Sequence, residues 1–174
     1  YLKHLLRQIA PEFREGLHYS IMFYGGRLLS HLTANDPEVD EFISLRRLNR
    51  HIAILIDSDK SSAHARINAT KQRIRDEFDK GPGFAWITKG REIENYIPND
   101  GLEVAVKAVY TNATRLKSSK QFDHALHYIS GRKTKTEVDK VKVAHEAIKL
   151  SPSADVLDLK QQLERIVQFV RDAN

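Results

Sequence analysis

The sequence predicts an α/β fold in which a short parallel sheet is flanked by helices in a Rossmann-like layer. Residues 51–56 form a continuous apolar run between polar residues, which is typical of a strand covered on both faces. Helical patterns separate this run from two further short apolar runs, at 18–24 and 84–88. Because alternating strands and helices favour right-handed parallel connections, we expect functional residues at the carboxyl ends of these strands.

The elements of this layer have recognisable boundaries. Gly25-Gly26 follows the first strand as a tight turn, Asn35-Asp36-Pro37 caps a helix, and Gly81-Pro82-Gly83 precedes the third strand. In chain order we predict a lead-in helix (2–14), a strand (18–24), the start of a helix (27–32), a short amphipathic helix (39–45), a strand (51–56), a helix (62–78) and a strand (84–88).

The rest of the chain predicts helices joined by polar loops. The pattern turns helical after Pro98, and two stretches rich in polar and basic residues, 112–120 and 130–135, interrupt it. Two more helices, at 141–150 and 156–170, close the chain. We therefore predict an α/β domain over residues 1–117, lead-in helix included, and a helical C-terminal extension over residues 118–174.

Composition limits the classes of function. The chain contains no cysteine, so a metal site can use only oxygen and imidazole ligands. The net charge of +5 favours an anionic partner such as nucleic acid, although many basic domains of this size bind nothing anionic. No apolar stretch approaches the roughly 18 residues of a membrane helix, so we expect no membrane partner and a cytoplasmic location. Because position 1 is Tyr1 rather than Met, we expect a piece of a longer polypeptide.

Two carboxylates follow the buried strand directly. Asp57 and Asp59 stand where the backbone leaves the sheet, so both side chains can turn toward a hard cation such as Mg²⁺ or Mn²⁺. Lys60 follows them and can oppose the charge of a phosphate in the transition state. The alternative is that both aspartates cap the next helix, a duty that Ser61-Ser62 could share. We favour the metal site because two acids and a lysine exceed what a cap requires.

A second acidic pair follows the third strand. Glu92 and Glu94 belong to the segment 89–98, KGREIENYIP, which reaches the same sheet edge. An extended segment places both glutamates on one face, whereas a helical segment separates them by about 200°. The apolar spacing favours a helix, so we predict that Glu92 faces the metal and that Glu94 supports it or pairs with Arg91 or a lysine. A plain pair of surface acids is the alternative.

Other motifs carry less information. Gly25-Gly26 would let backbone amides approach a phosphate closely, but a simple tight turn explains the pair equally well. The histidines form no HxH or HxxxH pair, which argues against a zinc site, and we interpret His124 and His127 as surface residues. The sequence contains no GxSxG or P-loop motif, which argues against a serine hydrolase and a self-contained ATPase.

An apolar strand, DSD, a helix, a strand and GREIENYIP together resemble the Toprim domain of overcoming-lysogenisation-defect (OLD) family nucleases, over roughly residues 17–110. The DxD motif is shared by many Toprim proteins, whereas the REIENY segment is more particular to the OLD-like branch. The resemblance implies an amino-terminal ABC-type ATPase domain in the same full-length chain, a homodimer formed through that domain, and DNA cleavage with divalent metal ions. It also implies that Asp57, Asp59 and Glu92 are metal ligands.

The match to that family is incomplete. Toprim domains ordinarily end their first strand with Glu followed by Gly, and Tyr24 occupies the Glu position, while Leu28 stands where OLD relatives can have Asp. Gly90 stands where relatives can place a Ser, and Lys140 or Lys142 matches a basic residue near the scissile phosphate. A phenol with a pKa of about 10 is a poor metal ligand or general base at neutral pH, so Tyr24 argues against full two-metal catalysis.

Three functional hypotheses follow. The first is phosphodiester hydrolysis by a Mg²⁺-activated water, with Asp57, Asp59 and Glu92 at the metal and Lys60 or Arg91 on the phosphate. The second is a catalytically degenerate Toprim domain that binds DNA or a partner protein without cutting. The third is a haloacid-dehalogenase-like phosphatase, which also opens with an apolar strand and DxD, but which GREIENY fits poorly.

Overall fold

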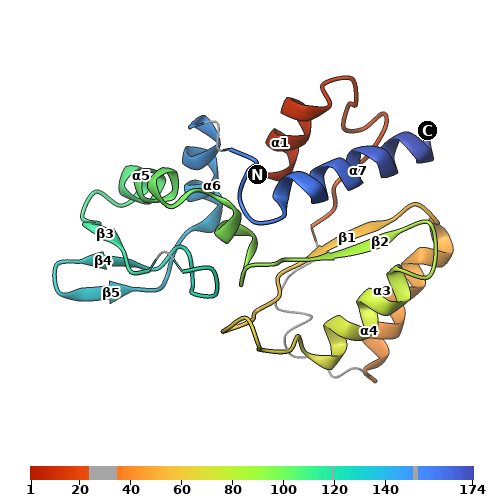
Figure 1. The fold of residues 1–174 in the computed structure, drawn as a ribbon, viewed down its shortest axis with the longest axis horizontal. Coiled ribbons are helices and arrows are strands. Elements are labelled where there is room, and N and C mark those ends of the chain that lie inside the picture. The colour runs from red at the N-terminus through yellow and green to blue at the C-terminus, as the bar shows by residue number, and fades with distance from the viewer. Residues whose placement is uncertain (24–34, 119, 151–152) are drawn as a thin grey trace.

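The computed structural model describes residues 1–23, 35–118, 120–150 and 153–174. Figure 1 shows two lobes, one built on β1 and β2 with α1, α3, α4 and α7, and one built of α5, α6 and β3 to β5. The elements in chain order are α1 (Leu2–Ile9), α3 (Pro37–Leu48), β1 (Ala53–Ile56), α4 (Ala69–Phe78), β2 (Phe84–Ile87), the 3₁₀ helix η1 (Ile93–Tyr96), α5 (Asn99–Val109), β3 (Arg115–Leu116), β4 (Tyr128–Ser130), β5 (Lys133–Lys135), α6 (Lys140–Lys149) and α7 (Leu159–Ala173).

The first lobe is a three-layer arrangement around a parallel pair of strands. β1 and β2 pair in register, with Leu55 opposite Trp86, and α4 connects them. Leu55 and Trp86 pack toward α1 and α7, whereas Ile56 and its neighbours Ile54 and Ala85 pack toward α3 and α4. Each strand therefore buries side chains on both faces, and the predicted α/β class with a short parallel sheet flanked by helices is confirmed. None of the described helices is long and apolar enough to cross a membrane.

The predicted first strand is not formed within residues 18–23. This segment contains only an isolated bridge between Glu15 and Tyr19. The side chains of Met22 and Phe23 are 75% and 87% exposed, so the apolar run that suggested a strand does not enter the sheet. Residue 24, the Gly25-Gly26 turn and the predicted helix at 27–32 lie outside the described residues.

The helix between β1 and β2 begins later than predicted. α4 begins at Ala69, where the Asn68 side chain accepts a hydrogen bond from the backbone N–H of Lys71, and residues 57–68 form a loop instead. Asp59 adopts a positive φ of 54°, which a right-handed helix cannot contain. Since Asn68 caps α4, the alternative in which Asp57 and Asp59 cap this helix is wrong.

The second lobe corrects the prediction of a helical extension over residues 118–174. β3, β4 and β5 form an antiparallel sheet, so the polar stretches at 112–120 and 130–135 contain strands, and position 117 falls between β3 and β4. All three residues of β5 are exposed, which leaves no apolar alternation to read from the sequence. The sheet packs with α5 and α6 around a core that includes Val106, Leu126 and Val143.

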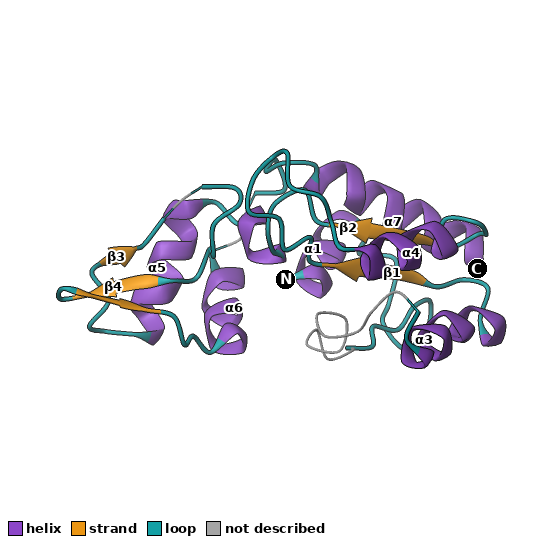
Figure 2. Ribbon diagram, turned by 90° about the horizontal axis from the view of Figure 1, so that it is seen from below, coloured by secondary structure: helices purple, strands orange, loops and turns teal. Residues whose placement is uncertain are grey.

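The last helix returns to the first lobe. Leu159 and Leu163 of α7 pack against Leu5 and Leu6 of α1 and against the β1–β2 sheet. Figure 2 shows the two lobes along the long axis, with α7 in the lobe of β1 and β2. The loop that follows β2 meets the second lobe, where the Arg91 N–H donates to the carbonyl oxygen of Gln121 and Gln121 Nε2 donates to that of Lys89.

Candidate functional site

The DSD motif follows β1 and is anchored by its middle residue. Ser58 is 3% exposed, its N–H donates to Thr88 Oγ1 at 2.8 Å, and its Oγ donates to the carbonyl oxygen of Gly90 at 2.5 Å. Thr88 Oγ1 donates to the same carbonyl at 3.0 Å. These bonds fix the loop after β1 to the loop after β2, and they hold the two flanking aspartates at the carboxyl end of the sheet.

Gly90 is needed where the loop after β2 folds back on Asn95 and meets Gln121 of the second lobe. A Cβ atom there would lie 2.7 Å from Asn95 Cβ and 3.2 Å from the carbonyl oxygen of Gln121. A serine at this position would collide with Asn95 unless the loop moved.

Asp57 is the more enclosed of the two aspartates. Its Oδ1 accepts a hydrogen bond from the N–H of Ile93 at 2.8 Å, and no described group donates to its Oδ2. Burial raises the pKa of the Asp57 carboxyl, while the Ile93 hydrogen bond and the charge of Lys140 oppose this rise and the charges of Glu92 and Asp59 add to it. Asp57 therefore lies among other carboxylates and has one oxygen to which no group of the described residues donates.

Asp59 turns toward solvent and toward a buried lysine. Its side chain is 56% exposed, and its carboxylate pairs with Nζ of Lys71, whose side chain is only 4% exposed. Lys71 Nζ also donates to the carbonyl oxygen of Asp57 at 2.7 Å, while the N–H of Asp59 donates to the carbonyl oxygen of Arg91 at 2.9 Å. A left-handed conformation in a non-glycine residue costs free energy, and such strain concentrates at functional sites.

Glu92 and Glu94 converge on one lysine, Lys140. Lys140 Nζ lies 2.9 Å from Glu92 Oε2 and 3.2 Å from Glu94 Oε1. Both glutamates are buried. The predicted divergence of the two glutamates is wrong, because Glu92 is extended and precedes η1, so the spacing of a continuous helix does not apply. Glu92 Oε1 also accepts the N–H of Ala125 at 2.9 Å.

Burial and neighbouring charges shift the pKa values of Glu94 and Lys140. Burial raises the pKa of the Glu94 carboxyl, Lys140 opposes that rise, and the neighbouring Glu92 and Asp57 carboxylates add to it. Burial alone would lower the pKa of the Lys140 ammonium, but Glu94 and Glu92 outweigh burial and raise it. Asp57, Glu92 and Glu94 are therefore gathered at one sheet edge, with Lys140 as their common cation.

The other predicted basic residues lie around the same loops or away from them. Lys60 Nζ donates to the carbonyl oxygen of Ala63 at 3.0 Å, and Arg91 Nη1 donates to the carbonyl oxygen of Lys60 at 3.4 Å. Arg91 Nε is buried without a hydrogen-bond partner among the described groups. Lys142 is 72% exposed and pairs with Asp139 on its own helix, so it is not part of the acidic group. Gly25 and Gly26 lie outside the described residues.

His124 and His127 lie beside this site, although the sequence predicts them to be surface residues. The rings of His124 and His127 stack with centroids 4.4 Å apart, and His124 Nδ1 lies 3.9 Å from Glu92 Oε1. Burial, then the neighbouring His124, lower the pKa of His127. The i, i+3 spacing was the only available signal, because Glu92 is remote in sequence.

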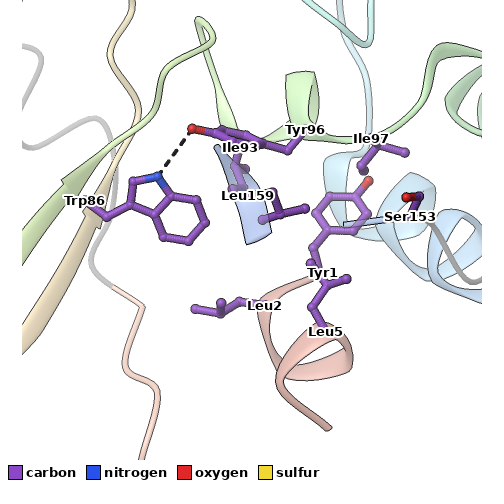
Figure 3. A pocket seen from close by; sticks show the side chains of 9 residues that line it. All are labelled: Tyr1, Leu2, Leu5, Trp86, Ile93, Tyr96, Ile97, Ser153 and Leu159. Carbon is purple, nitrogen blue, oxygen red and sulfur yellow. Dashed lines mark hydrogen bonds between the residues drawn. The ribbon is translucent and has the colours of Figure 1, made fainter. Parts of the chain in front are cut away.

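An apolar cavity next to the site is too small for a substrate. Figure 3 shows Trp86, Tyr96 and Leu159 around it, with Tyr1 closing one side. Its volume is about 20 Å³, which one water molecule would fill. Tyr96 Oη accepts from Trp86 Nε1 at 3.3 Å and donates to Asp158 Oδ1 at 2.7 Å, so this region links β2 to α7. We assign it a structural role.

The donor atoms decide what the site could hold. Within the described ranges, no three or more His, Asp or Glu side chains are arranged to hold a metal ion. Among the four acids of the site, only Asp57 and Asp59 have a carboxylate oxygen that no described lysine or backbone group contacts, since Lys140 and the N–H of Ala125 occupy Glu92 and Lys140 occupies Glu94. An all-oxygen pair of this kind suits a hard cation that keeps most of its water ligands, as Mg²⁺ does.

No protein-family model matches the chain, and no curated protein or solved structure matches it either. The resemblance to the Toprim domain of OLD family nucleases therefore stays a prediction that rests on the DSD and GREIENYIP motifs.

Proposed function

We propose that Asp57 and Asp59 bind a divalent cation, Mg²⁺ or Mn²⁺, and that the domain uses it to hydrolyse phosphodiester bonds in DNA. The observation that carries the proposal is the Asp57 carboxylate, which is enclosed among other acids, has a raised pKa and keeps one oxygen without a described donor. When bound, the cation would polarise the phosphate and activate a water molecule.

Charge balance supports a cation in this place. Four carboxylates gather here, those of Asp57, Asp59, Glu92 and Glu94, whereas within the described part of the chain only two ammonium groups contact them, those of Lys71 and Lys140. Carboxylates crowded in a partly buried site repel one another, and a divalent cation would relieve that repulsion. Because the ligands must be deprotonated, affinity for the cation should rise with pH through the raised pKa of Asp57.

The chain's own residues would position the ligands and the substrate. Ser58 fixes the loop that carries both aspartates, and Lys71 orients the Asp59 carboxylate from the first turn of α4. Arg91 and Lys60 stand at the rim of the same loops, where their charges can hold a phosphate. Lys140 pairs with both Glu92 and Glu94 behind the ligands and opposes their charge.

The wider context of the proposal comes from the resemblance. A short parallel sheet between helices, with DSD after one strand and GREIENYIP after the next, is compatible with a Toprim-like layer. We propose that this domain works beside an ABC-type ATPase domain in a longer, cytoplasmic protein that dimerises through the ATPase.

The second candidate is a degenerate domain that binds DNA or a protein without cutting. The observation that favours it is Lys140, because its ammonium group contacts both Glu92 and Glu94 and so replaces a metal at those positions. Tyr24, where a catalytic Glu was expected, points in the same direction.

Nicking of supercoiled plasmid in Mg²⁺ or Mn²⁺ separates the two candidates. We expect cleavage by the wild-type protein and a loss of at least about a hundred-fold in Asp57→Asn and Asp59→Asn. Asp172→Asn, on the exposed end of α7, is the matched control and should cleave like wild type. Cleavage that is unchanged in both active-site variants would contradict the assignment, whereas metal-independent DNA binding without cleavage would support the second candidate.

A further inference from the structure

A loop of the second lobe, described at residues 117–118 and 120–127, lies directly on the loops that carry the acidic residues. The Arg91 N–H donates to the carbonyl oxygen of Gln121 at 3.0 Å, and Gln121 Nε2 donates to the carbonyl oxygen of Lys89 at 2.8 Å. Asn95 Nδ2 donates to the carbonyl oxygen of Asp123 at 3.1 Å. These bonds hold the loop in a fixed place beside Glu92.

The loop presents flat rings among cations. Phe122 is half-buried and has Lys60 Nζ 5.9 Å from its ring centroid. His124 is exposed and stacks on His127 with an interplanar angle of 26°. Lys117, which is exposed at the start of the loop, acts electrostatically on His127, as does Arg91.

Rings interleaved with cations are the features that bind unpaired nucleotides. Bases stack on aromatic side chains, and lysine or arginine side chains follow the phosphates between them. A duplex hides the faces of its bases, so it gains the phosphate contacts alone. Lys60 Nζ lies 5.9 Å from the Phe122 ring centroid, which is near the outer limit of a cation–π contact. A nucleotide base could therefore take the place of Lys60 on the ring, and the lysine could move to a phosphate.

We propose that Phe122, His124 and His127 form a stacking surface that binds single-stranded nucleic acid and leads it to Asp57 and Asp59. The inference rests on the proposed function for what happens to the strand, but the binding itself requires no metal. The stacked pair of histidines would supply one ring face, and Phe122 would supply another. Lys60, Lys117 and Arg91 would neutralise the phosphates.

The test is fluorescence anisotropy in EDTA with a labelled oligothymidylate of about ten nucleotides and with a duplex of the same length. We expect the single strand to bind about ten-fold more tightly than the duplex, and Phe122→Leu and the double variant His124→Gln/His127→Gln each to lose about ten-fold on the single strand alone. Phe13→Leu is the control for Phe122→Leu, because each phenylalanine ring has a cationic side chain near it. Arg171 Cζ lies 6.0 Å from the Phe13 ring centroid, and Lys60 Nζ lies 5.9 Å from the Phe122 ring centroid. His145→Gln, exposed on α6, is the control for the histidines.

The binding test is independent of cleavage. Asp57→Asn should bind the single strand in EDTA at least as tightly as wild type does, even if it cuts nothing, since the variant removes a negative charge. Equal affinity of wild type for single strand and duplex would overturn the inference, as would variants in the loop that bind like the controls. Circular dichroism of each loop variant distinguishes lost stacking from lost folding.

Discussion

Replacing Lys140 with methionine should destabilise the folded protein by roughly 1–3 kcal/mol at neutral pH. Methionine retains much of the apolar stem but removes the charge that both Glu92 and Glu94 face, at 2.9 and 3.2 Å. The glutamate side chains are only 10% and 5% exposed, and an uncompensated buried charge typically costs about 3–5 kcal/mol. The Lys140 side chain is itself 53% exposed, so solvent screening lowers the expected cost.

The cost of Lys140→Met should depend on pH. The pKa of Glu94 is already raised by burial although Lys140 opposes the rise, so without the lysine it should rise further. A carboxyl with a higher pKa in the folded than in the unfolded state binds more protons when folded, and its contribution to stability falls as pH rises between those two values. The destabilisation should therefore be larger at about pH 8 than at about pH 5.

Urea unfolding followed by tryptophan fluorescence measures both effects. Trp86 is the single tryptophan and is 2% exposed, so it reports the unfolding of the first lobe. Lys142→Met is the control, because Lys142 is 72% exposed and pairs with Asp139, the N-cap residue of α6; its cost should stay within about 0.5 kcal/mol. Equal losses in the two variants, or a Lys140→Met loss that is the same at both pH values, would refute the account of a lysine shared by two buried acids.

The remaining predictions concern the supports of the site. Gly83→Ala should cost roughly 2–4 kcal/mol, because its Cβ would lie 2.1 Å from the carbonyl oxygen of Ile52. Gly101→Ala, in α5, should stabilise by about 0.5–1 kcal/mol, because its Cβ would make an ordinary contact with Leu150 Cδ1 at 3.9 Å; urea unfolding of the two variants should therefore give opposite signs. Tyr96→Phe removes the hydrogen bond that Tyr96 donates to Asp158 and the two that it accepts from the N–H groups of Lys89 and Trp86. It should therefore cost roughly 1–3 kcal/mol of unfolding free energy and change the fluorescence of Trp86. An unchanged urea midpoint and an unchanged emission spectrum would count against this link to α7.

The sequence predicted the parts of the fold that depend on local patterns. The apolar runs of β1 and β2 stood out because both strands bury alternate side chains on two faces. Their parallel pairing brings the DSD and GREIENYIP loops to the same edge, as expected. The short strands of the second lobe were missed because β5 is exposed throughout and β3 has two residues, so neither shows an apolar period.

The details of the site depended on contacts that no local pattern encodes. The sequence pattern predicts that the basic residues of this helix face solvent, yet Lys71 is buried, because the 57–68 loop places Asp59 against its ammonium group. His124 approaches Glu92 only because the 120–127 part of the second lobe packs on the first. Lys140 was connected to the site through the family resemblance, and no sequence pattern pairs it with two glutamates 46 and 48 residues away.

Calorimetric titration of Mn²⁺ tests the central claim, a divalent cation on Asp57 and Asp59, most directly. We predict one binding event for the wild-type protein that strengthens as pH rises, that is lost in Asp57→Asn, and that persists in the control Asp172→Asn. The same titration of Lys140→Met tells whether the cation competes with the lysine for Glu92 and Glu94. Wild-type protein that binds no Mn²⁺, or Asp57→Asn that binds it unchanged, would contradict the claim.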